Sequence, residues 1–243
     1  MKTVLITGAS RGIGRACALT FAKEGYAVAV NYHHNREAAE SLIAELHGLG
    51  ADAALFCADM ADSAEVTQMG ETVLKRFGHV DVLVCNAGIA EQKLVTDITD
   101  DDWQRMMAVN VNGMFYSCRA LLPHMIRRQR GKIITVSSIW GITGASCEVA
   151  YSTAKAAVIG FTKALAKEVG PSGICVNCVA PGVIDTDMNG HLDETARAEL
   201  ADETPLGRMG TPQEAADVIA FLASEKAAFI TGQVISPNGG FII

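Results

Sequence analysis

The sequence predicts an α/β fold in which a doubly wound parallel sheet of about seven strands carries helices on both faces. Three observations support this prediction. Short apolar runs alternate with longer helical patterns along the chain. A glycine-rich turn joins the first apolar run to the first helical pattern. The length of 243 residues suits one domain, residues 1–243, with a sizeable core.

The composition argues against several classes of protein. Hydrophobic residues make up 49% and charged residues 19% of the chain, which indicates a globular protein without a disordered tail. The formal net charge of −7 argues against a nucleic-acid partner, because phosphate contacts need a clustered basic surface. No run of about 18 apolar residues predicts a membrane span, and the N-terminus has no signal-peptide pattern. We therefore expect a cytoplasmic protein without membrane association.

The seven cysteines do not indicate a metal or redox centre. Cys175 and Cys178 have Cys-x-x-Cys spacing, but positions three apart in a strand point to opposite faces, and no second pair completes a zinc site. His33 and His34 are likewise unsupported as metal ligands. We expect no metal, and we predict that six cysteines in apolar stretches behave as small buried residues: Cys17, Cys57, Cys85, Cys118, Cys175 and Cys178.

The first predicted strand, Lys2 to Ile6, leads into a glycine-rich turn and then a helical pattern that continues through Lys23. The glycines of this turn allow a tight bend and a close approach of the backbone to a ligand. A turn in this position directs backbone N–H groups and the positive end of the helix at a phosphate. The pattern therefore favours dinucleotide binding over a plain strand-to-helix turn.

The octapeptide Thr7-Gly-Ala-Ser-Arg-Gly-Ile-Gly14 has glycines spaced G-x-x-x-G-x-G and resembles the coenzyme loop of the short-chain dehydrogenase/reductase family, whose members are single-domain Rossmann enzymes. Later landmarks of that family follow in register along the whole chain. The resemblance implies a nicotinamide coenzyme contacted by six residues of the loop: Gly8, Ser10, Arg11, Gly12, Ile13 and Gly14.

The second predicted strand, Ala27 to Asn31, ends where NAD-selective members of the family place an acidic residue on the ribose 2′-hydroxyl. This chain has Asn31-Tyr-His-His-Asn-Arg36 there, with no carboxylate to repel a 2′-phosphate. Together with Arg11, Arg36 favours NADP(H) as the coenzyme, and Asn31 is expected to border it. The alternative is that both arginines are ordinary solvated charges.

The middle of the chain predicts two more pairs of helix and strand: a helix at Arg36 to Leu49, a strand at Ala53 to Cys57, a helix at Ala64 to Phe77 and a strand at Val80 to Cys85. By resemblance, Asp59 and Met60 after the third strand border the adenine pocket. The tripeptide after the fourth strand resembles the family's Asn-Ala-Gly, so Asn86, Ala87 and Gly88 are expected to flank the coenzyme.

A long helical pattern runs from Trp103 towards Arg127, after three aspartates whose carboxylates suit a helix N-terminus rather than a metal. Within it, Asn110 lies among apolar residues, where a buried amide needs hydrogen-bond partners. A structural role would explain Asn110 on its own. By resemblance, Asn110 holds a water molecule that relays protons from the active-site lysine.

The stretch after the predicted strand Lys132 to Val136 carries a pair of ionisable groups. Tyr151 and Lys155 are four residues apart in a helical pattern, Ala150 to Val169, which puts both side chains on one face, roughly 5–6 Å apart at Cβ. One positive charge ~5 Å from the phenol favours the phenolate by roughly 3 kcal/mol, about two pK units, at an effective dielectric of ~20. The pair therefore predicts a tyrosine that exchanges protons near neutral pH. The alternative is one buried ring and one solvated amine.

In the family, the residues that match Ser138, Tyr151, Lys155 and Asn110 form the catalytic set. The resemblance implies that Ser138 hydrogen-bonds a substrate carbonyl and that Tyr151 protonates its oxygen. It also implies that Lys155 lowers the pKa of Tyr151 and binds the nicotinamide ribose. Tyr151 and Lys155 are therefore expected to contact the coenzyme as well as the substrate.

After a predicted strand at Cys175 to Val179, the next loop resembles the family segment that packs on nicotinamide. By that resemblance the coenzyme contacts are Pro181, Gly182, Ile184 and Thr186. The polar, helix-like stretch from Met188 to Met209 suits a lid over the substrate at about 187–210, with Met188 in contact with it. The alternative is an ordinary surface helix.

The last stretch, Thr211 to Ile243, resembles the final helix and strand of the family. The family usually has Asp before the Gly-Gly pair near the end of the chain, and this chain has Asn238. In the family this end builds a subunit interface, so the resemblance implies a homotetramer.

Within the family, the chain is most similar to the 3-oxoacyl-acyl carrier protein reductases, in Ala180-Pro-Gly-Val-Ile-Asp-Thr-Asp-Met188 and in Pro205-Leu-Gly-Arg-Met-Gly-Thr-Pro212. The implied reaction is NADPH-dependent reduction of a ketone on a thioester, with acyl carrier protein as partner. Two departures bear on this substrate. The family's usual Asn-x-Gly-Gln-x-Asn-Tyr run is Ala145-Ser-Cys-Glu-Val-Ala-Tyr151 here, with Glu148 in place of Gln, and the basic residue that usually precedes Gly-Ile is Ser172. Glu148 would repel an anionic substrate and attract an ammonium group.

Two alternatives remain for the function. Ser137-Ser-Ile-Trp-Gly141 and Gly144-Ala-Ser-Cys-Glu148 also resemble a subgroup that reduces an aminopentanone group on a lysine of elongation factor P, which would then be the partner. A non-catalytic sensor of NADP(H) belongs to a different class. A sensor would be expected to lack the tyrosine or the lysine, and this chain has both.

Overall fold

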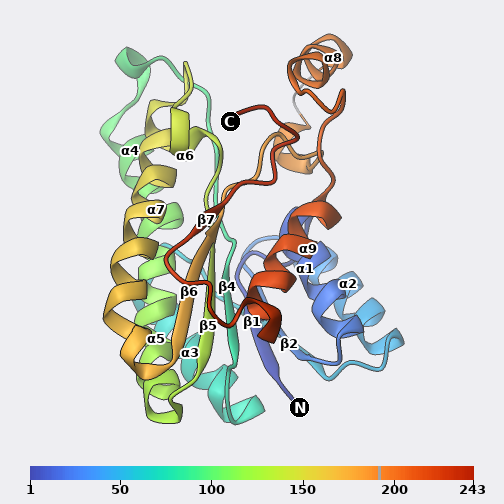
Figure 1. Cartoon of the computed structure of the whole chain (residues 1–243), viewed down its shortest axis with the longest axis vertical. Coiled ribbons are helices and arrows are strands. Elements are labelled where there is room, and N and C mark those ends of the chain that lie inside the picture. The colour runs from blue at the N-terminus through green and yellow to red at the C-terminus, as the bar shows by residue number, and fades with distance from the viewer. Residues whose placement is uncertain (191–192) are drawn as a thin grey trace.

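The computed structural model describes residues 1–190 and 193–243, and its centre is a seven-stranded sheet (Figure 1). All neighbouring strands pair in parallel, in the order β3-β2-β1-β4-β5-β6-β7. The expected doubly wound parallel sheet is therefore confirmed. The strands are β1 Thr3–Ile6, β2 Ala27–Tyr32, β3 Ala53–Cys57, β4 Val82–Cys85, β5 Gly131–Val136, β6 Ile174–Val179 and β7 Val234–Ile235.

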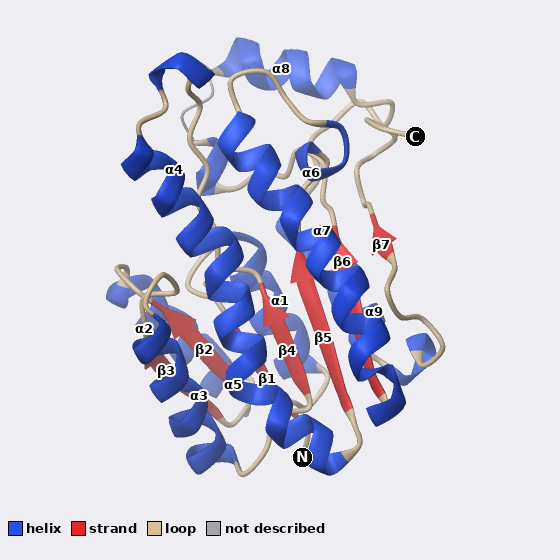
Figure 2. Ribbon diagram, turned by 90° about the vertical axis from the view of Figure 1, so that its left-hand side faces the viewer, coloured by secondary structure: helices blue, strands red, loops and turns tan. Residues whose placement is uncertain are grey.

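Helices cover both faces of the sheet, with α1, α2 and α9 on one face and α3, α4, α5 and α7 on the other (Figures 1 and 2). The short helix α6 and the helix α8 lie beyond the carboxyl ends of the strands. The helices are α1 Gly12–Lys23, α2 Arg36–Gly48, α3 Ser63–Phe77, α4 Asp100–Met107, α5 Gly113–Arg128, α6 Trp140–Thr143, α7 Val149–Val169, α8 Glu194–Glu203 and α9 Pro212–Ala223.

Side-chain caps fix where several helices begin. Thr99 and Asp102 form a reciprocal capping box at the start of α4, and Asp100 and Asp101 add negative charge to its first turn. Thr211 and Glu214 form the same arrangement at the start of α9. Each cap satisfies backbone N–H groups that the first turn of a helix leaves without partners.

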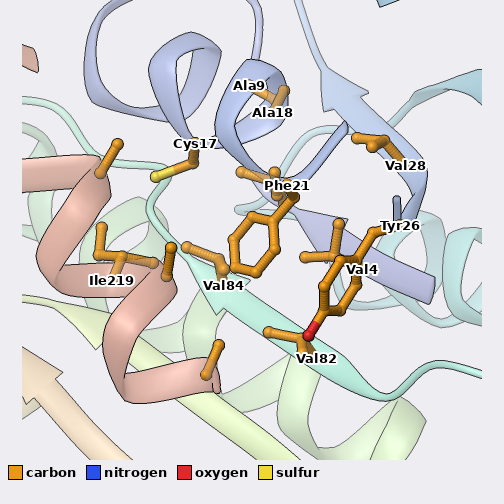
Figure 3. Close-up of a cluster of buried hydrophobic side chains, with 14 of the residues drawn as sticks. Val4, Ala9, Cys17, Ala18, Phe21, Tyr26, Val28, Val82, Val84 and Ile219 are labelled. Carbon is orange, nitrogen blue, oxygen red and sulfur yellow. The ribbon is translucent and has the colours of Figure 1, made fainter. Parts of the chain in front are cut away.

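The layer under α1, α2 and α9 is a dry apolar core (Figure 3). Phe21 of α1 is fully buried and packs edge-on against Tyr26, with ring centroids 5.1 Å apart. Val4 and Val84 reach it from β1 and β4, and Ile219 reaches it from α9. This packing holds α1, which begins at the glycine-rich turn, against the sheet and α9.

The other layer packs α3, α5 and α7 on the opposite face of the sheet. Its largest fully buried side chains include Leu83 and Ile133 from the sheet and Leu121 and Met125 from α5. The continuously apolar strands agree with a sheet that is covered on both sides. The layer fixes α7, and with it the Tyr151 and Lys155 side chains, relative to the end of β5.

The expected final strand is present as β7 and is two residues long. Two other expectations about local structure were wrong. The helical pattern from Trp103 is interrupted by a π-helical turn, Ala108–Asn112, in which the Asn110 amide bonds the carbonyl oxygens of Ile89 and Met106. Cys57 is exposed and Cys175 is partly exposed, since they lie at the end of an edge strand and at the start of β6. The other four cysteines of the predicted six are buried.

Among the described residues, no helix is both long enough and apolar enough to cross a bilayer.

Candidate active site

A cleft of about 670 Å³ opens at the carboxyl ends of the strands, around the point between β1 and β4 where the order of strands along the sheet reverses. The predicted site residues gather there from segments spread over the whole chain. Two of them, Gly14 and Asn110, lie behind its wall. The predicted residues that line it are Gly8, Ser10, Arg11, Gly12, Ile13, Asn31, Asp59, Met60, Asn86, Ala87, Gly88, Ser138, Glu148, Tyr151, Lys155, Pro181, Gly182, Ile184, Thr186 and Met188.

The turn between β1 and α1 forms one end of the cleft. Gly8 and Gly12 have φ values of +63° and +53°, a region that favours glycine. A Cβ atom on Gly14 would lie 2.4 Å from the carbonyl oxygen of Gly8, so Gly14 allows the helix to pack against the turn. Among the described residues, no side chain caps the first N–H groups of α1. The turn therefore fits a phosphate group, which would accept from these N–H groups.

Asn31 supports this turn from below. Its Oδ1 accepts a hydrogen bond from the backbone N–H of Gly8 at 3.0 Å. Its Nδ2 lies 3.3 Å from the carbonyl oxygens of Phe56 and Ala58. With 1% of its surface exposed, Asn31 uses its amide inside the protein and ties the turn to β3. Asn31 is therefore expected to border the coenzyme without offering it a free side-chain amide.

Asn86 supports the turn from the other side. Its Nδ2 donates to the carbonyl oxygens of Thr7 at 3.0 Å and Gly8 at 3.1 Å. The hydroxyl of Thr7 in turn accepts from the backbone N–H groups of Asn86 and Ala87, both at 3.0 Å. These bonds lock the end of β4 to the turn, so the floor of the cleft is a single hydrogen-bonded unit.

The catalytic candidates lie at the ends of β5 and along α7. Tyr151 and Lys155 are 8% and 4% exposed, and the Lys155 Nζ atom lies 5.5 Å from the centroid of the tyrosine ring. Lys155 donates a hydrogen bond to the carbonyl oxygen of Val136 at 3.0 Å. The hydroxyl of Ser138 bonds the phenol of Tyr151. The structure therefore brings serine, tyrosine and lysine together at one wall of the cleft.

The electrostatics of this cluster differ from the expectation. Burial raises the pKa of Tyr151 to about 12, although its bond with Ser138 opposes the rise, and the nearby carboxylate of Glu148 raises it further. Burial lowers the pKa of Lys155 to about 8. The expected shift of the Tyr151 pKa towards neutral pH was wrong, because burial of the phenol raises its pKa instead. At neutral pH the phenol is protonated.

Asn110 lies in the π-helical turn, behind the cleft wall. Its Nδ2 donates to the carbonyl oxygens of Ile89 at 3.0 Å and Met106 at 3.1 Å, and its Oδ1 accepts from Ile89 N–H at 3.3 Å. A Cβ atom on Gly88 would lie 2.6 Å from Asn110 Oδ1 and 3.2 Å from Lys155 Nζ. Gly88 therefore lies between the Asn110 amide and the Lys155 amine, and its lack of a side chain lets both groups approach it closely.

The C-terminal segment packs against the loop at 181–186, which lines the cleft. A Cβ atom on Gly182 would lie 2.7 Å from the Cα of Asn238, so the two loops touch. Asn238 Nδ2 donates to Ser236 Oγ at 2.9 Å and to the carbonyl oxygen of Ile242 at 3.1 Å, and its Oδ1 accepts from Gly240 N–H at 2.8 Å. An aspartate could not donate these bonds, which explains the departure from the family pattern at this position.

The cleft also contains residues that the sequence reading left out. One group of these residues follows β2, and another lies around Glu148, whose Oε1 accepts a hydrogen bond from Gln92 Nε2 at 3.2 Å. The position of most of them shortly after the carboxyl end of a strand is the sequence signal that could have identified them. Arg36 does not line the cleft, since it pairs with Glu40 at 2.7 Å. The lining residues left out include Tyr32, His33, His34, Asn35, Ile89, Glu91, Gln92, Arg105 and Trp140.

The predicted lid lies above this cleft. Met188, Asn189 and Leu200 line the cleft from this segment, and α8 forms its helical part. The predicted range of about 187–210 also includes His191 and Leu192, which lie outside the described residues.

Comparison with known proteins agrees with this architecture. A short-chain dehydrogenase model, described as enoyl-(acyl carrier protein) reductase, matches residues 8–242. The chain is 45% identical over 241 residues to the uncharacterized oxidoreductase YmfI of Bacillus subtilis, covering 99% of this chain and 98% of that protein. It is 43% identical over 239 residues to the 3-oxoacyl-acyl-carrier-protein reductase FabG of Staphylococcus aureus, covering 98% and 97%.

A third relative, the 3-oxoacyl-acyl-carrier-protein reductase FabG of Thermotoga maritima, is 41% identical over 242 residues, covering 100% of this chain and 98% of that protein. The match extends over the turn after β1, the serine, tyrosine and lysine at the cleft wall, and the C-terminal loops. The chain therefore belongs to the short-chain dehydrogenase/reductase family and is an oxidoreductase.

Proposed function

We propose that the protein reduces a ketone to a secondary alcohol with NADPH, and that the ketone is a 3-oxoacyl thioester carried by acyl carrier protein. The observation that carries the proposal is the meeting of Ser138, Tyr151 and Lys155 on the wall of a cleft whose other end fits a phosphate. The relatives from Staphylococcus aureus and Thermotoga maritima bear the name of that reductase and align along nearly their full length.

Tyr151 supplies the proton in this proposal. Because burial raises its pKa to about 12, the phenol holds its proton at neutral pH and is suited to act as an acid. Ser138, already bonded to the phenol, is placed to donate to the same substrate oxygen and orient the carbonyl. When bound, the coenzyme supplies the hydride that reduces the carbonyl carbon.

Lys155 supplies positive charge beneath the reacting oxygen. Its pKa of about 8 leaves it mainly protonated at pH 7, and a cation there stabilises negative charge that develops on the tyrosine as its proton leaves. It is also placed to bind the nicotinamide ribose. Asn110, held close to Lys155 across Gly88, is proposed to position a water molecule that returns the proton.

The coenzyme preference rests on the adenosine end of the cleft. Arg11 lines it, and the second strand ends in Asn31 and Tyr32 without a carboxylate that would repel a 2′-phosphate. Asp59 borders this end, but the backbone N–H of Ala61 donates to its Oδ1 at 2.9 Å. We therefore favour NADP(H) over NAD(H), with Ser10, Ile13, Met60 and the loop 181–186 as further contacts.

A second candidate substrate is the 5-aminopentanone modification on a lysine of elongation factor P. The observation that favours it is the acidic substrate end of the cleft, where Glu91 and Glu148 both line the wall. A carboxylate in a cleft attracts an ammonium group and repels an anionic carrier. Trp140 lines the same end, and an aromatic ring there can attract a cation.

We further propose that the segment at about 187–210 acts as a lid. Its described part contributes Met188, Asn189 and Leu200 to the cleft, and α8 has no buried residue that would anchor it to the core. An element with few buried contacts opens at low free-energy cost. Entry of substrate under this segment would exclude water from Tyr151.

We also propose that the protein is a cytoplasmic homotetramer. Phe221, Phe229 and Ile243, in the last part of the chain, have exposed apolar side chains. Such side chains, when gathered on one region, mark surfaces that associate. Light scattering on the purified protein should give four times the mass of one chain at micromolar concentration, and a monomer mass would contradict the assembly without affecting the proposed chemistry.

The substitution Tyr151→Phe should lower kcat for ketone reduction by about 10²- to 10⁴-fold, because it removes the proton donor. NADPH binding, measured by the fluorescence of the reduced coenzyme, should persist. Tyr116→Phe, a tyrosine on α5 away from the cleft, serves as the matched control and should keep full activity. Retained activity in Tyr151→Phe would refute the assigned role, and NADPH binding without turnover of any ketone by the native protein would favour a sensor.

The rate of reduction should fall as the pH rises through about 8. Lys155, with its pKa near 8, loses its charge there, whereas Tyr151, with a pKa near 12, keeps its proton. A profile of kcat/KM from pH 6 to 10 measures this limb. In Lys155→Arg the residual activity should show the limb moved to higher pH, because guanidinium stays protonated. If kcat/KM of Lys155→Arg still fell at the same pH as in the native protein, the fall would belong to a group other than Lys155.

Glu148→Gln separates the two substrate proposals. If the substrate is a 3-oxoacyl thioester, reduction of acetoacetyl thioester should be unchanged or faster in the variant, because a repelling charge has gone. If the substrate carries an ammonium group, kcat/KM for an amino-ketone should fall about tenfold or more, since a hydrogen bond to a charged group is lost. Glu91→Gln is the control for a general effect of cleft charge, and equal effects of both variants on both substrates would contradict a specific role of Glu148.

A further inference from the structure

We propose that His33 and His34 form, with Arg11, a proton-coupled site for the 2′-phosphate of the coenzyme, so that binding of a 2′-phosphorylated nucleotide takes up a proton. The inference rests on the proposed use of NADP(H) and names the residues of this chain that read the phosphate. The sequence reading had set the two histidines aside.

The position of the pair is fixed by the sheet. β1 and β2 pair in parallel with Ile6 opposite Val30, so their carboxyl ends meet at one edge. The backbone N–H of Ala9 donates to the carbonyl oxygen of Asn31 at 2.9 Å, which joins the phosphate turn to the end of β2. In sheets of this kind the residues just after the second strand face the ribose of the adenosine. His33 and His34 occupy this place, and both line the cleft.

The two imidazole rings are stacked. Their centroids lie 3.6 Å apart at an interplanar angle of 36°. The Nδ1 atom of His33 also lies 3.8 Å from Oδ1 of Asp59, and the Asp59 carboxylate would attract a protonated imidazole. Two stacked imidazolium ions repel each other, so a second positive charge is unfavourable until an anion approaches. Protonation of the pair and phosphate binding therefore favour each other.

Apart from Arg11, the other described charged and titratable groups near the two histidines are already paired, hydrogen-bonded or buried, so none of them supplies a further positive charge to a bound phosphate. From α2, Arg36 faces this region but pairs with Glu40, and from α3 the carboxylate of Glu65 accepts the backbone N–H of Asp59 at 2.8 Å. From β3 the thiol of Cys57 donates to the backbone oxygen of His33. The phenol of Tyr32, at the end of β2, is buried.

Arg11 is thus the permanent cation that lines the cleft at this end among the described residues. A phosphate monoester carries nearly two negative charges near neutral pH. One arginine leaves about one of these charges without a partner, and a histidine is the side chain that supplies a proton in this pH range.

Calorimetric titration of the full-length protein tests the coupling, with 2′,5′-ADP and 5′-AMP as probes. At pH 7.5 the phosphate has little proton left to release, because its second ionisation lies near ~6. Titrations in two buffers of different ionisation enthalpy then report protons bound by the protein. We expect net uptake with 2′,5′-ADP and none with 5′-AMP, which lacks the 2′-phosphate. Equal uptake with both probes would overturn the proposal.

The double variant His33→Gln, His34→Gln locates the effect. It should bind 2′,5′-ADP about tenfold more weakly, or worse, since hydrogen bonds to charged groups are lost, and it should take up no proton. Its affinity for 5′-AMP should be unchanged, which shows that the site is still folded. Arg36→Gln is the matched control for general charge and should leave both affinities and the proton uptake as in the native protein.

Proton uptake that persists in the double variant, or an unchanged affinity for 2′,5′-ADP, would overturn the role of the histidines while leaving NADP(H) preference intact. Equal affinity of the native protein for 2′,5′-ADP and 5′-AMP would instead remove the NADP(H) preference and, with it, this inference. Because none of these readouts involves ketone reduction, failure of the proposed reaction would be seen separately.

Discussion

Burial of the Lys155 ammonium group is the constraint on which the rest of the site depends. With 4% of the Lys155 residue exposed, its amine loses most of its hydration, and such a loss is tolerated only when hydrogen bonds and nearby dipoles replace it. The carbonyl oxygen of Val136 provides one such bond at 3.0 Å. The hydroxyl of Ser137 holds the same helix by donating to the backbone oxygen of Lys155 at 2.8 Å. Helix α7 is therefore held directly against the carboxyl end of β5.

The same constraint explains two glycines near the amine. A Cβ atom on Gly88 would lie 3.2 Å from Lys155 Nζ, and one on Gly141 would lie 2.7 Å from the carbonyl carbon of Lys155. A side chain at position 141 would clash with the backbone of α7, and one at position 88 would displace the side chains of Asn110 and Lys155. The close packing also keeps water from the amine and the phenol, and this moves their pKa values in opposite directions.

Much of the fold and most of the site could be predicted from the sequence because the signals were local. The glycine turn, the strand ends and the spacing of Tyr151 and Lys155 depend on a few neighbouring residues, and family resemblance placed them in register. The direction of the Tyr151 pKa could not be predicted, since burial depends on the packing of distant segments. The π-helical turn at Asn110 and the internal use of Asn31 also depend on distant partners, the carbonyl groups of Ile89 and Phe56.

The two ends of the cleft are built in different ways, and this bears on how one fold serves different substrates. At the coenzyme end, buried amides of Asn31 and Asn86 bond backbone atoms, so a substitution there would disturb the turn itself. At the other end, side chains that are at least partly exposed make the contacts, as between Gln92 and Glu148. A change in Glu148 alters charge without loosening the sheet. Selectivity for the ketone can therefore vary while coenzyme binding stays fixed.

The C-terminal segment connects these two ends. Asn238 packs against Gly182 in the loop at the nicotinamide end, and three residues later the ring of Phe241 meets Trp140 edge-on, with centroids 5.6 Å apart and planes at 82°. Trp140 lines the substrate end and follows Ser138 by two residues, with its backbone N–H donating to the Ser138 hydroxyl at 3.2 Å. The last residues of the chain thus pack against the indole that follows Ser138. A contact that moves this segment would reach Ser138 through one aromatic pair.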